Sequence, residues 1–176
     1  MTRTRRKLLV TAMLILVGGA GLMCVFARMT EEEPNCTLIE KGLYLGGDVP
    51  KPPPGTKAVL NLCEKKDPYQ CETHVWEPIR DAEPVPSLDW LDQQMKRITH
   101  HRAEGRAVFV HCYNGVSRSG MVVVAYLMRD RGWGVDEAMA FVRRSRPGLR
   151  PHPAFLALLR EYEKRERPSQ DGREGR

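Results

Sequence analysis

The stretch Val108–Gly120, with the sequence Val-Phe-Val-His-Cys-Tyr-Asn-Gly-Val-Ser-Arg-Ser-Gly, decides how the rest of the chain is organised. Its first three residues are apolar and typical of a buried strand, the following residues with their central glycine are typical of a loop, and the apolar run 121–127 predicts a helix. A loop that ends at a helix N-terminus turns successive backbone N–H groups inward and gains the partial positive charge of the helix. The stretch therefore predicts an anion-binding loop between a strand and a helix.

Four residues of this stretch suit chemistry on a phosphate. The backbone N–H groups and the guanidinium of Arg118 favour the thiolate of Cys112 over its thiol, and Arg118 can bind two phosphate oxygens at once. Gly115 permits a turn that a side chain would obstruct, and Ser119 can donate its hydroxyl to the sulfur. Taken singly, such a cysteine is usually a small buried side chain and such an arginine is usually solvated. Together the four predict a nucleophilic cysteine in a phosphate site.

The same loop carries a family resemblance. The chain resembles the cysteine-based protein phosphatases, whose signature His-Cys-x-x-Gly-x-x-Arg-Ser/Thr is matched at His111, Cys112, Gly115, Arg118 and Ser119. From Thr37 to Lys164 it is similar to the dual-specificity phosphatases, through Leu43-Tyr44-Leu45-Gly46, Val59-Leu60-Asn61-Leu62, Arg146-Pro147 and Phe155. The proline-rich segment 50–55 is shorter than the helical segment that such proteins commonly carry there. The resemblance implies that phosphate is bound by Tyr113, Asn114, Gly115, Val116, Ser117 and Arg118.

Attack by Cys112 on a phosphate monoester needs a carboxylic acid that protonates the leaving oxygen. Asp81 is the predicted acid, because its loop follows an extended run and loops after parallel strands gather at one end of a sheet. The resembled family has its acid in the matching place, where the carboxylate then activates water. Glu83, in the same loop, is the alternative. His111 is expected to orient the loop and tune the thiolate through hydrogen bonding, and a purely structural buried histidine is the other interpretation.

The order of the remaining patterns predicts an α/β fold of the cysteine-phosphatase type. Apolar runs at 38–39 and 43–45 predict a hairpin, 58–62 and 74–79 predict extended segments, and helices are expected from Ser87 to 105, over 121–131 and 135–145, and from Pro153 onward. Such alternation is typical of a largely parallel central sheet flanked by helices. Roughly 130 residues suit one domain, predicted at 37–164, preceded by a linker at 30–36 and followed by a disordered polar tail at 165–176.

The N-terminal residues 1–29 combine basic residues with an apolar run. Residues 8–27 are 20 positions without a charge, which is long enough to cross a bilayer, so an N-terminal membrane helix is expected. The basic residues before the run and the three glutamates at 31–33 predict a single-pass protein with its catalytic domain on the non-cytoplasmic side. A signal cleaved near Ala27, giving a secreted protein, is the alternative.

The distribution of charges, histidines and cysteines indicates which binding partners and cofactors to expect. The formal net charge is +6, but five basic residues lie at positions 3, 5, 6, 7 and 28, ahead of the domain, so no nucleic acid partner is expected. The scattered histidines 74, 100, 101 and 152 lack metal-ligand spacing, and no metal or cofactor is predicted. Of the five cysteines, Cys63 and Cys71 could form a disulfide or remain free thiols. A monomer is expected.

These patterns lead to one predicted function and its alternatives. The chain is expected to hydrolyse phosphotyrosine, with or without phosphoserine and phosphothreonine, in protein substrates through a phosphocysteine at Cys112. Loop positions 113, 114, 116 and 117 contain no lysine, which favours phosphoproteins over phosphoinositides, whose extra phosphates attract basic residues. The alternatives are a phosphoinositide phosphatase, a membrane-tethered phosphate-binding module without turnover, and a sulfur-transfer or arsenate-reducing enzyme.

Overall fold

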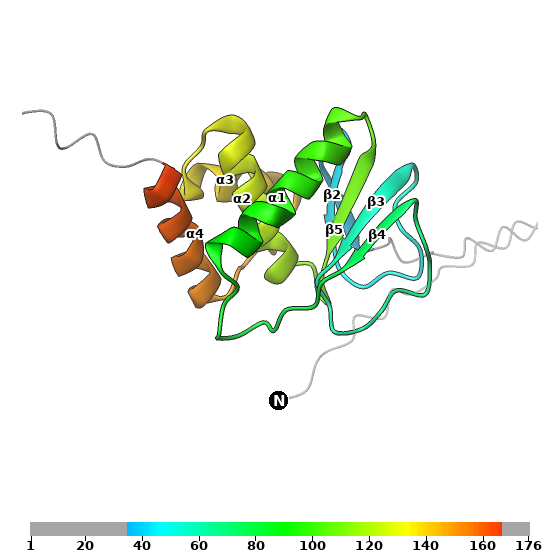
Figure 1. Cartoon of the computed structure of the whole chain (residues 1–176), viewed down its shortest axis with the longest axis horizontal. Helices are drawn as coiled ribbons and strands as arrows, with labels where there is room; N and C mark the ends of the chain where they lie inside the picture. The colour runs from blue at the N-terminus through cyan, green and yellow to red at the C-terminus, as the bar shows by residue number, and fades with distance from the viewer. Residues whose placement is uncertain (1–34, 167–176) are drawn as a thin grey trace, which may run out of the picture. The chain divides into compact units, whose positions relative to one another are not determined.

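A computed structural model describes residues 35–166, which form one sheet with its helices on one side (Figure 1). The strands and helices are, in chain order, β1 (Cys36–Glu40), β2 (Leu43–Gly46), β3 (Thr56–Asn61), β4 (Thr73–Trp76), α1 (Leu88–Ala103), β5 (Ala107–His111), α2 (Arg118–Arg131), α3 (Val135–Ser145) and α4 (Pro153–Glu166). The predicted strand, loop and helix around Cys112 are thus β5, the loop 112–117 and α2.

The sheet is mixed, with the strand order β1-β2-β5-β3-β4. Strands β2, β5, β3 and β4 run parallel to one another, whereas β1 runs antiparallel to β2 and forms the predicted hairpin with it. The α/β class is confirmed, and the antiparallel edge strand is the departure from an all-parallel sheet. Parallel neighbours place the carboxyl ends of β5, β3 and β4 at one edge, so the loops that follow these strands meet there.

The two faces of the sheet are covered differently. Val108 and Val110 of β5 belong to the large core that contains the residues of the helices, whereas Phe109 packs in a smaller cluster with Val49 and Val59. Because successive side chains of a strand point to opposite faces, His111 lies on the same face as Phe109, and their rings stack with centroids 4.9 Å apart. Cys112 packs in the core on the helix side.

The helices begin and end where local chemistry allows. Ser87 caps α1 as predicted, since its Oγ accepts a hydrogen bond of 3.1 Å from the backbone N–H of Trp90. α2 ends at Gly132, whose φ of 66° is the left-handed conformation that glycine adopts without strain. Residues 118–128 of α2 are all buried, because this helix packs against the sheet, α1, α3 and α4. The position of α2, and with it that of the loop 112–117, is therefore fixed by packing against these elements.

Two predicted boundaries are wrong. α4 continues through residues 165 and 166, where the sequence predicts the start of a disordered tail. The helix is extended because Arg165 bonds to Asp92 at 2.6 Å and lies over the ring of Tyr162. Cys36, assigned to the linker, begins β1. Residues 1–34 and 167–176, including the predicted membrane segment, lie outside the described residues, and Cys63 and Cys71 are free thiols.

Candidate active site

The loop 112–117 places Cys112 between β5 and the first turn of α2. Cys112 is 2% exposed, and its backbone N–H donates a 3.2 Å hydrogen bond to the carbonyl of Gly46 at the end of β2. The Oγ of Ser119 lies 3.2 Å from the sulfur of Cys112 and 3.3 Å from the carbonyl oxygen of Gly46. A hydroxyl has one hydrogen to donate, so Ser119 can direct it to the sulfur when negative charge develops there.

Arg118 is anchored through one nitrogen of its guanidinium. Its Nη1 donates hydrogen bonds to the carboxylate of Glu64 at 2.6 Å, to the carbonyl of Ile79 at 3.0 Å and to the carbonyl of Leu62 at 3.3 Å. The guanidinium lowers the pKa of Glu64 through its hydrogen bond. The Nε of Arg118 is buried and has no hydrogen-bond partner among residues 35–166. The Nε side of the guanidinium is thus available to oxygens of an anion.

Gly115 allows the loop to turn tightly against β2. Its φ is 68°, a conformation that side chains disfavour. A Cβ at this position would stand 2.3 Å from the backbone carbonyl carbon of Gly46. Both the angle and the contact therefore require glycine at position 115, as the sequence pattern predicted.

Arg146 holds the outer side of the same turn. Its Nε donates to the carbonyl of Gly115 at 2.5 Å, and its Nη2 donates to the carbonyl of Asn114 at 3.0 Å. The same guanidinium also reaches the hydroxyl of Thr37 at 3.0 Å and the side-chain oxygen of Asn35 at 2.6 Å. Because one guanidinium binds both the loop carbonyls and the residues at the start of β1, Arg146 joins the loop to this strand.

Asp81, the predicted acid, lies beside the loop. The Oγ of Ser117 donates a 2.5 Å hydrogen bond to Oδ1 of Asp81 and accepts one of 2.9 Å from the backbone N–H of His152. Since the His152 N–H occupies a lone pair of Ser117, the hydroxyl hydrogen of Ser117 is directed at the carboxylate. Within the described part of the chain, no hydrogen bond or ion pair joins Glu83 to this loop. Of the two predicted carboxylates, Asp81 is the one that contacts the loop.

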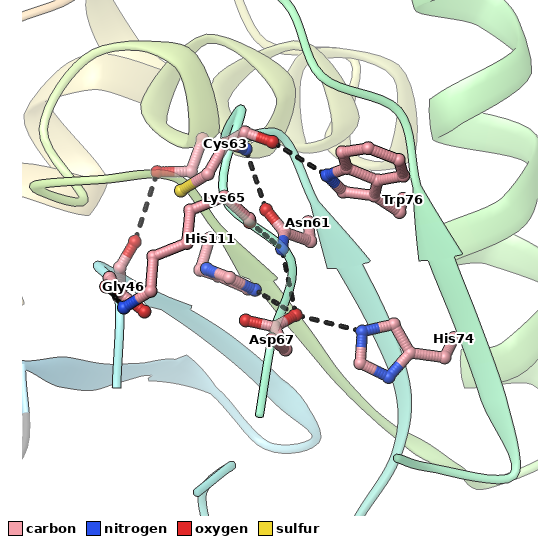
Figure 2. Close-up of polar contacts among 10 residues, drawn as sticks. Gly46, Asn61, Cys63, Lys65, Asp67, His74, Trp76 and His111 are labelled. Atoms are coloured by element: carbon pink, nitrogen blue, oxygen red, sulfur yellow. Dashed lines mark hydrogen bonds and ion pairs between the residues drawn. The ribbon is translucent and has the colours of Figure 1, made fainter. Parts of the chain in front are cut away.

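His111 takes part in a buried cluster that the sequence analysis missed (Figure 2). Its Nε2 lies 3.1 Å from Oδ2 of Asp67, and the same oxygen lies 2.9 Å from Nε2 of His74 and 2.9 Å from Nδ2 of Asn61. Burial acts to raise the pKa of Asp67, but the hydrogen bonds and charges of His111 and His74 outweigh it, so the pKa is lowered. Asp67 therefore favours the carboxylate form although its side chain is only 1% exposed.

The other predicted loop residues line the turn with backbone groups. The carbonyl of Tyr113 accepts a 3.0 Å hydrogen bond from the N–H of Asp48, and that of Val116 accepts one of 2.8 Å from the N–H of Arg150. The side chain of Tyr113 is 59% exposed. Backbone N–H groups of neighbouring loops thus bind the outward-facing carbonyls of the loop 112–117.

One group of residues at the end of α1 could ligate a metal ion. The ligand atoms of His100, His101 and Glu104 lie within 4.8 Å of one another. Glu104 is already paired with Arg106 at 3.2 Å, so a cation there would compete with an ion pair. The prediction that the chain needs no metal stays a prediction.

Comparison with known proteins identifies the family. Residues 53–165 match the family model described as the dual specificity phosphatase catalytic domain. The chain belongs to this family. It is 37% identical over 106 residues to human dual specificity protein phosphatase 16 and 36% identical over 107 residues to rat protein phosphatase Slingshot homolog 3. Each alignment covers 60% of this chain and 16% of the relative, so the chain spans about a sixth of the length of these relatives.

Solved structures of dual specificity and tyrosine phosphatases share the fold. Human DUSP28 is similar with a TM-score of 0.67 and 25% identity, covering 76% of this chain and 96% of that protein. The active form of Tk-PTP is similar with a TM-score of 0.65 and 30% identity, covering 76% of this chain and 99% of that protein. The mixed sheet with its helices is therefore the dual specificity phosphatase fold.

The predicted single-pass localisation is corrected. No helix within residues 35–166 is long and apolar enough to span a bilayer. The longest of them, α1, has 16 residues, whereas a span needs about 20 apolar residues. The family match begins at residue 53 and lends no support to the membrane segment, to the non-cytoplasmic placement of the domain or to the secreted alternative. The run 8–27, on which the prediction rested, lies outside the described residues.

Proposed function

We propose that this dual specificity phosphatase domain hydrolyses phosphotyrosine in protein substrates, with or without phosphoserine and phosphothreonine, through a phosphocysteine at Cys112. One observation carries the proposal: Cys112, the Ser119 hydroxyl, the Asp81 carboxylate and the Nε of Arg118, which has no partner among residues 35–166, meet at one loop. Hydrolysis of a phosphate monoester by a cysteine uses these four kinds of group: the nucleophilic sulfur, a hydrogen-bond donor to that sulfur, a guanidinium that binds the phosphate oxygens, and an acid.

The first step transfers the phosphoryl group to sulfur. The thiolate of Cys112 attacks phosphorus, the bond from phosphorus to the ester oxygen breaks, and its electron pair stays on the leaving oxygen. Asp81 in its acid form gives its proton to that oxygen, so the leaving group departs as a neutral alcohol or phenol. Arg118 and the N–H groups of the loop bind the phosphoryl oxygens in the transition state.

The second step frees the enzyme. Asp81, now a carboxylate, takes a proton from water, and the water oxygen attacks phosphorus. The bond between sulfur and phosphorus breaks, and its electron pair returns to the sulfur of Cys112. The hydroxyl of Ser119, 3.2 Å from that sulfur, stabilises the charge by donating its hydrogen. Inorganic phosphate leaves and the thiolate is restored.

The substrate proposal rests on the loop and the family. The loop positions 113, 114, 116 and 117 carry no basic side chain, and a human relative with 37% identity is named a dual specificity protein phosphatase. Three further features belong to the proposal: a catalytic domain that includes every element from β1 to α4, residues 36–166, a monomeric state that size-exclusion chromatography would test, and the role of His111 in orienting the loop.

The test uses the full-length chain and its Cys112→Ser variant. We expect the wild type to release phosphate from an aryl phosphate and a phosphotyrosine peptide in the presence of a chelator, and the variant to show no turnover. Turnover by Cys112→Ser would refute the phosphocysteine mechanism. Binding of phosphopeptides without turnover under reducing conditions would replace the enzyme by a binding module, and faster turnover of phosphoinositide vesicles would replace the protein substrate by a lipid.

A further inference from the structure

Two arginines on the loops that border the phosphate loop, Arg80 and Arg150, have exposed side chains. Within residues 35–166, no hydrogen bond, ion pair or aromatic ring engages either guanidinium. Every other arginine of this range makes at least one such contact. A guanidinium carries five N–H donors that suit carboxylate and phosphate oxygens. The two arginines that lack a partner in this part of the chain thus stand where a substrate arrives.

Contacts on both sides hold the backbone of Arg80 at the phosphate loop. The carbonyl of the preceding residue, Ile79, accepts a 3.0 Å hydrogen bond from Nη1 of Arg118. The carboxylate of the following residue, Asp81, accepts one of 2.5 Å from the hydroxyl of Ser117. Because both neighbours of Arg80 bind residues that follow Cys112, its side chain is presented beside the site.

Arg150 is held in a similar way by the loop that precedes α4. Its backbone N–H donates a 2.8 Å hydrogen bond to the carbonyl of Val116. Two residues later, the N–H of His152 donates one of 2.9 Å to Oγ of Ser117. Since Asp81 and His152 bind the same hydroxyl of Ser117, the two loops meet at this residue. Each loop therefore presents one exposed arginine close to the phosphate site.

Charged side chains of the third neighbouring loop, which follows β3, already have partners. Glu64 binds Arg118 at 2.6 Å, and Lys65 pairs with Asp48 at 2.6 Å. The pKa of Glu64 is lowered mainly by its hydrogen bond with Arg118, and the charge of Arg80 adds to this effect. The positive charge of Arg80 therefore reaches the group that binds the phosphate-binding guanidinium.

We propose that Arg80 and Arg150 are specificity-determining residues, which select phosphopeptides with acidic residues next to the phosphorylated residue. A guanidinium can bind a carboxylate through two N–H groups. The additional phosphates of a phosphoinositide lie next to the reacting phosphate, but the loop 112–117 contains no lysine or arginine to meet them. The carboxylates of neighbouring residues lie farther away along a peptide, as the two arginines do along the rim. The proposal deepens the proposed function and rests on the loop as the phosphate site.

The experiment measures the binding of fluorescent phosphotyrosine peptides to the full-length Cys112→Ser chain by fluorescence anisotropy. One peptide has glutamate on both sides of the phosphotyrosine, and the other has glutamine there. We expect the acidic peptide to bind more tightly. This preference should fall about two- to fivefold in Arg80→Gln and in Arg150→Gln, which is the size of an exposed ion pair. It should vanish in the double variant and shrink as the salt concentration rises.

The ratio of the two dissociation constants separates selectivity from a general loss of phosphate binding, which would weaken both peptides equally. Arg106→Gln is the matched control, because it removes the same charge at the amino end of β5, opposite to the loop 112–117. It should leave the ratio unchanged. Equal binding of the two peptides, or a ratio that both Arg80→Gln and Arg150→Gln leave unchanged, would overturn the proposal.

Phosphatidylcholine vesicles that contain a phosphatidylinositol phosphate provide the competing ligand. If they bind more tightly than the acidic peptide and lose this binding in the double variant, the two arginines serve a lipid and the proposal is overturned. Peptide binding needs no turnover. Absence of phosphatase activity in the chain with intact Cys112 would therefore refute the proposed function, while the ratio of dissociation constants would still decide the role of the two arginines.

Discussion

Ser117→Ala should lower kcat by about 10- to 100-fold, because the hydroxyl of Ser117 is what holds Asp81 at the loop. The 2.5 Å hydrogen bond from Ser117 to the Asp81 carboxylate is the contact that joins the two loops. A hydrogen bond to a charged group contributes about 1.5–3 kcal/mol. Since each 1.36 kcal/mol in the barrier is tenfold in rate, losing the contact in the transition state accounts for that range. The loss should not exceed the contribution of the acid itself, which is about 10²–10⁴-fold in rate.

The assay compares kcat for two aryl phosphates whose leaving phenols differ in acidity. An acid matters most for a poor leaving group, so Asp81→Ala should lose about 10²–10⁴-fold with the less acidic phenol and much less with the more acidic one. Ser117→Ala should show the same dependence on the leaving group with a smaller loss. In the Asp81→Ala background, Ser117→Ala should change kcat little, because the acid that it positions has been removed.

Two results would refute this reasoning. If Ser117→Ala costs as much in the Asp81→Ala background as in the wild type, Ser117 supports the loop structure through its contact with the N–H of His152 and does not act through Asp81. Glu83→Ala is the matched control on the same loop and should keep nearly all activity. A loss larger than that of Asp81→Ala would transfer the role of the acid to Glu83.

Two further predictions follow from pKa shifts. Burial, together with the charges of His100 and Arg106, lowers the pKa of His101 below its usual 6.5. The unfolded chain therefore takes up this proton first, and stability should be lost as the pH falls below 6.5. Urea unfolding at two pH values should show a smaller loss of stability for His101→Gln than for the wild type, and equal losses would contradict the prediction. Burial and the charge of Cys112 raise the pKa of Cys63 to about 12, so Cys63 should resist iodoacetamide at pH 8 in the folded chain and react only after unfolding, as peptide mass mapping would show.

Local patterns in the sequence were sufficient for the elements and for the centre of the site. Cys112, Arg118 and Ser119 lie within one strand-loop-helix segment, where backbone geometry follows from residue type and spacing. Asp81 is predicted as the acid because the chemistry demands one and the parallel sheet restricts the loops that can supply it, and the structure places its carboxylate beside the loop. The bond from Ser117 to Asp81 joins positions 36 apart, and nothing in either loop indicates that this serine rather than its neighbours makes the contact.

The rest depended on how distant segments meet. Asp67 stands in a polar loop that by itself suggests only solvated side chains, and its contact with His111 depends on the register of three strands and on the path of that loop. His74 looked like one of several scattered histidines for the same reason. The membrane localisation failed because it was inferred from the hydropathy of residues 8–27, and that pattern says nothing about the domain that follows.

The carbonyl of Gly46 contacts both the backbone of Cys112 and the hydroxyl of Ser119. These contacts matter for the choice of a fragment for expression. Gly46 belongs to β2 and precedes residue 53, where the family match begins. A fragment cut at that boundary would retain every residue of the phosphatase signature and yet lack the strand against which the signature loop is built. It would also lack Asn35 and Thr37, which bind Arg146. The shortest fragment that preserves these contacts starts at or before Asn35.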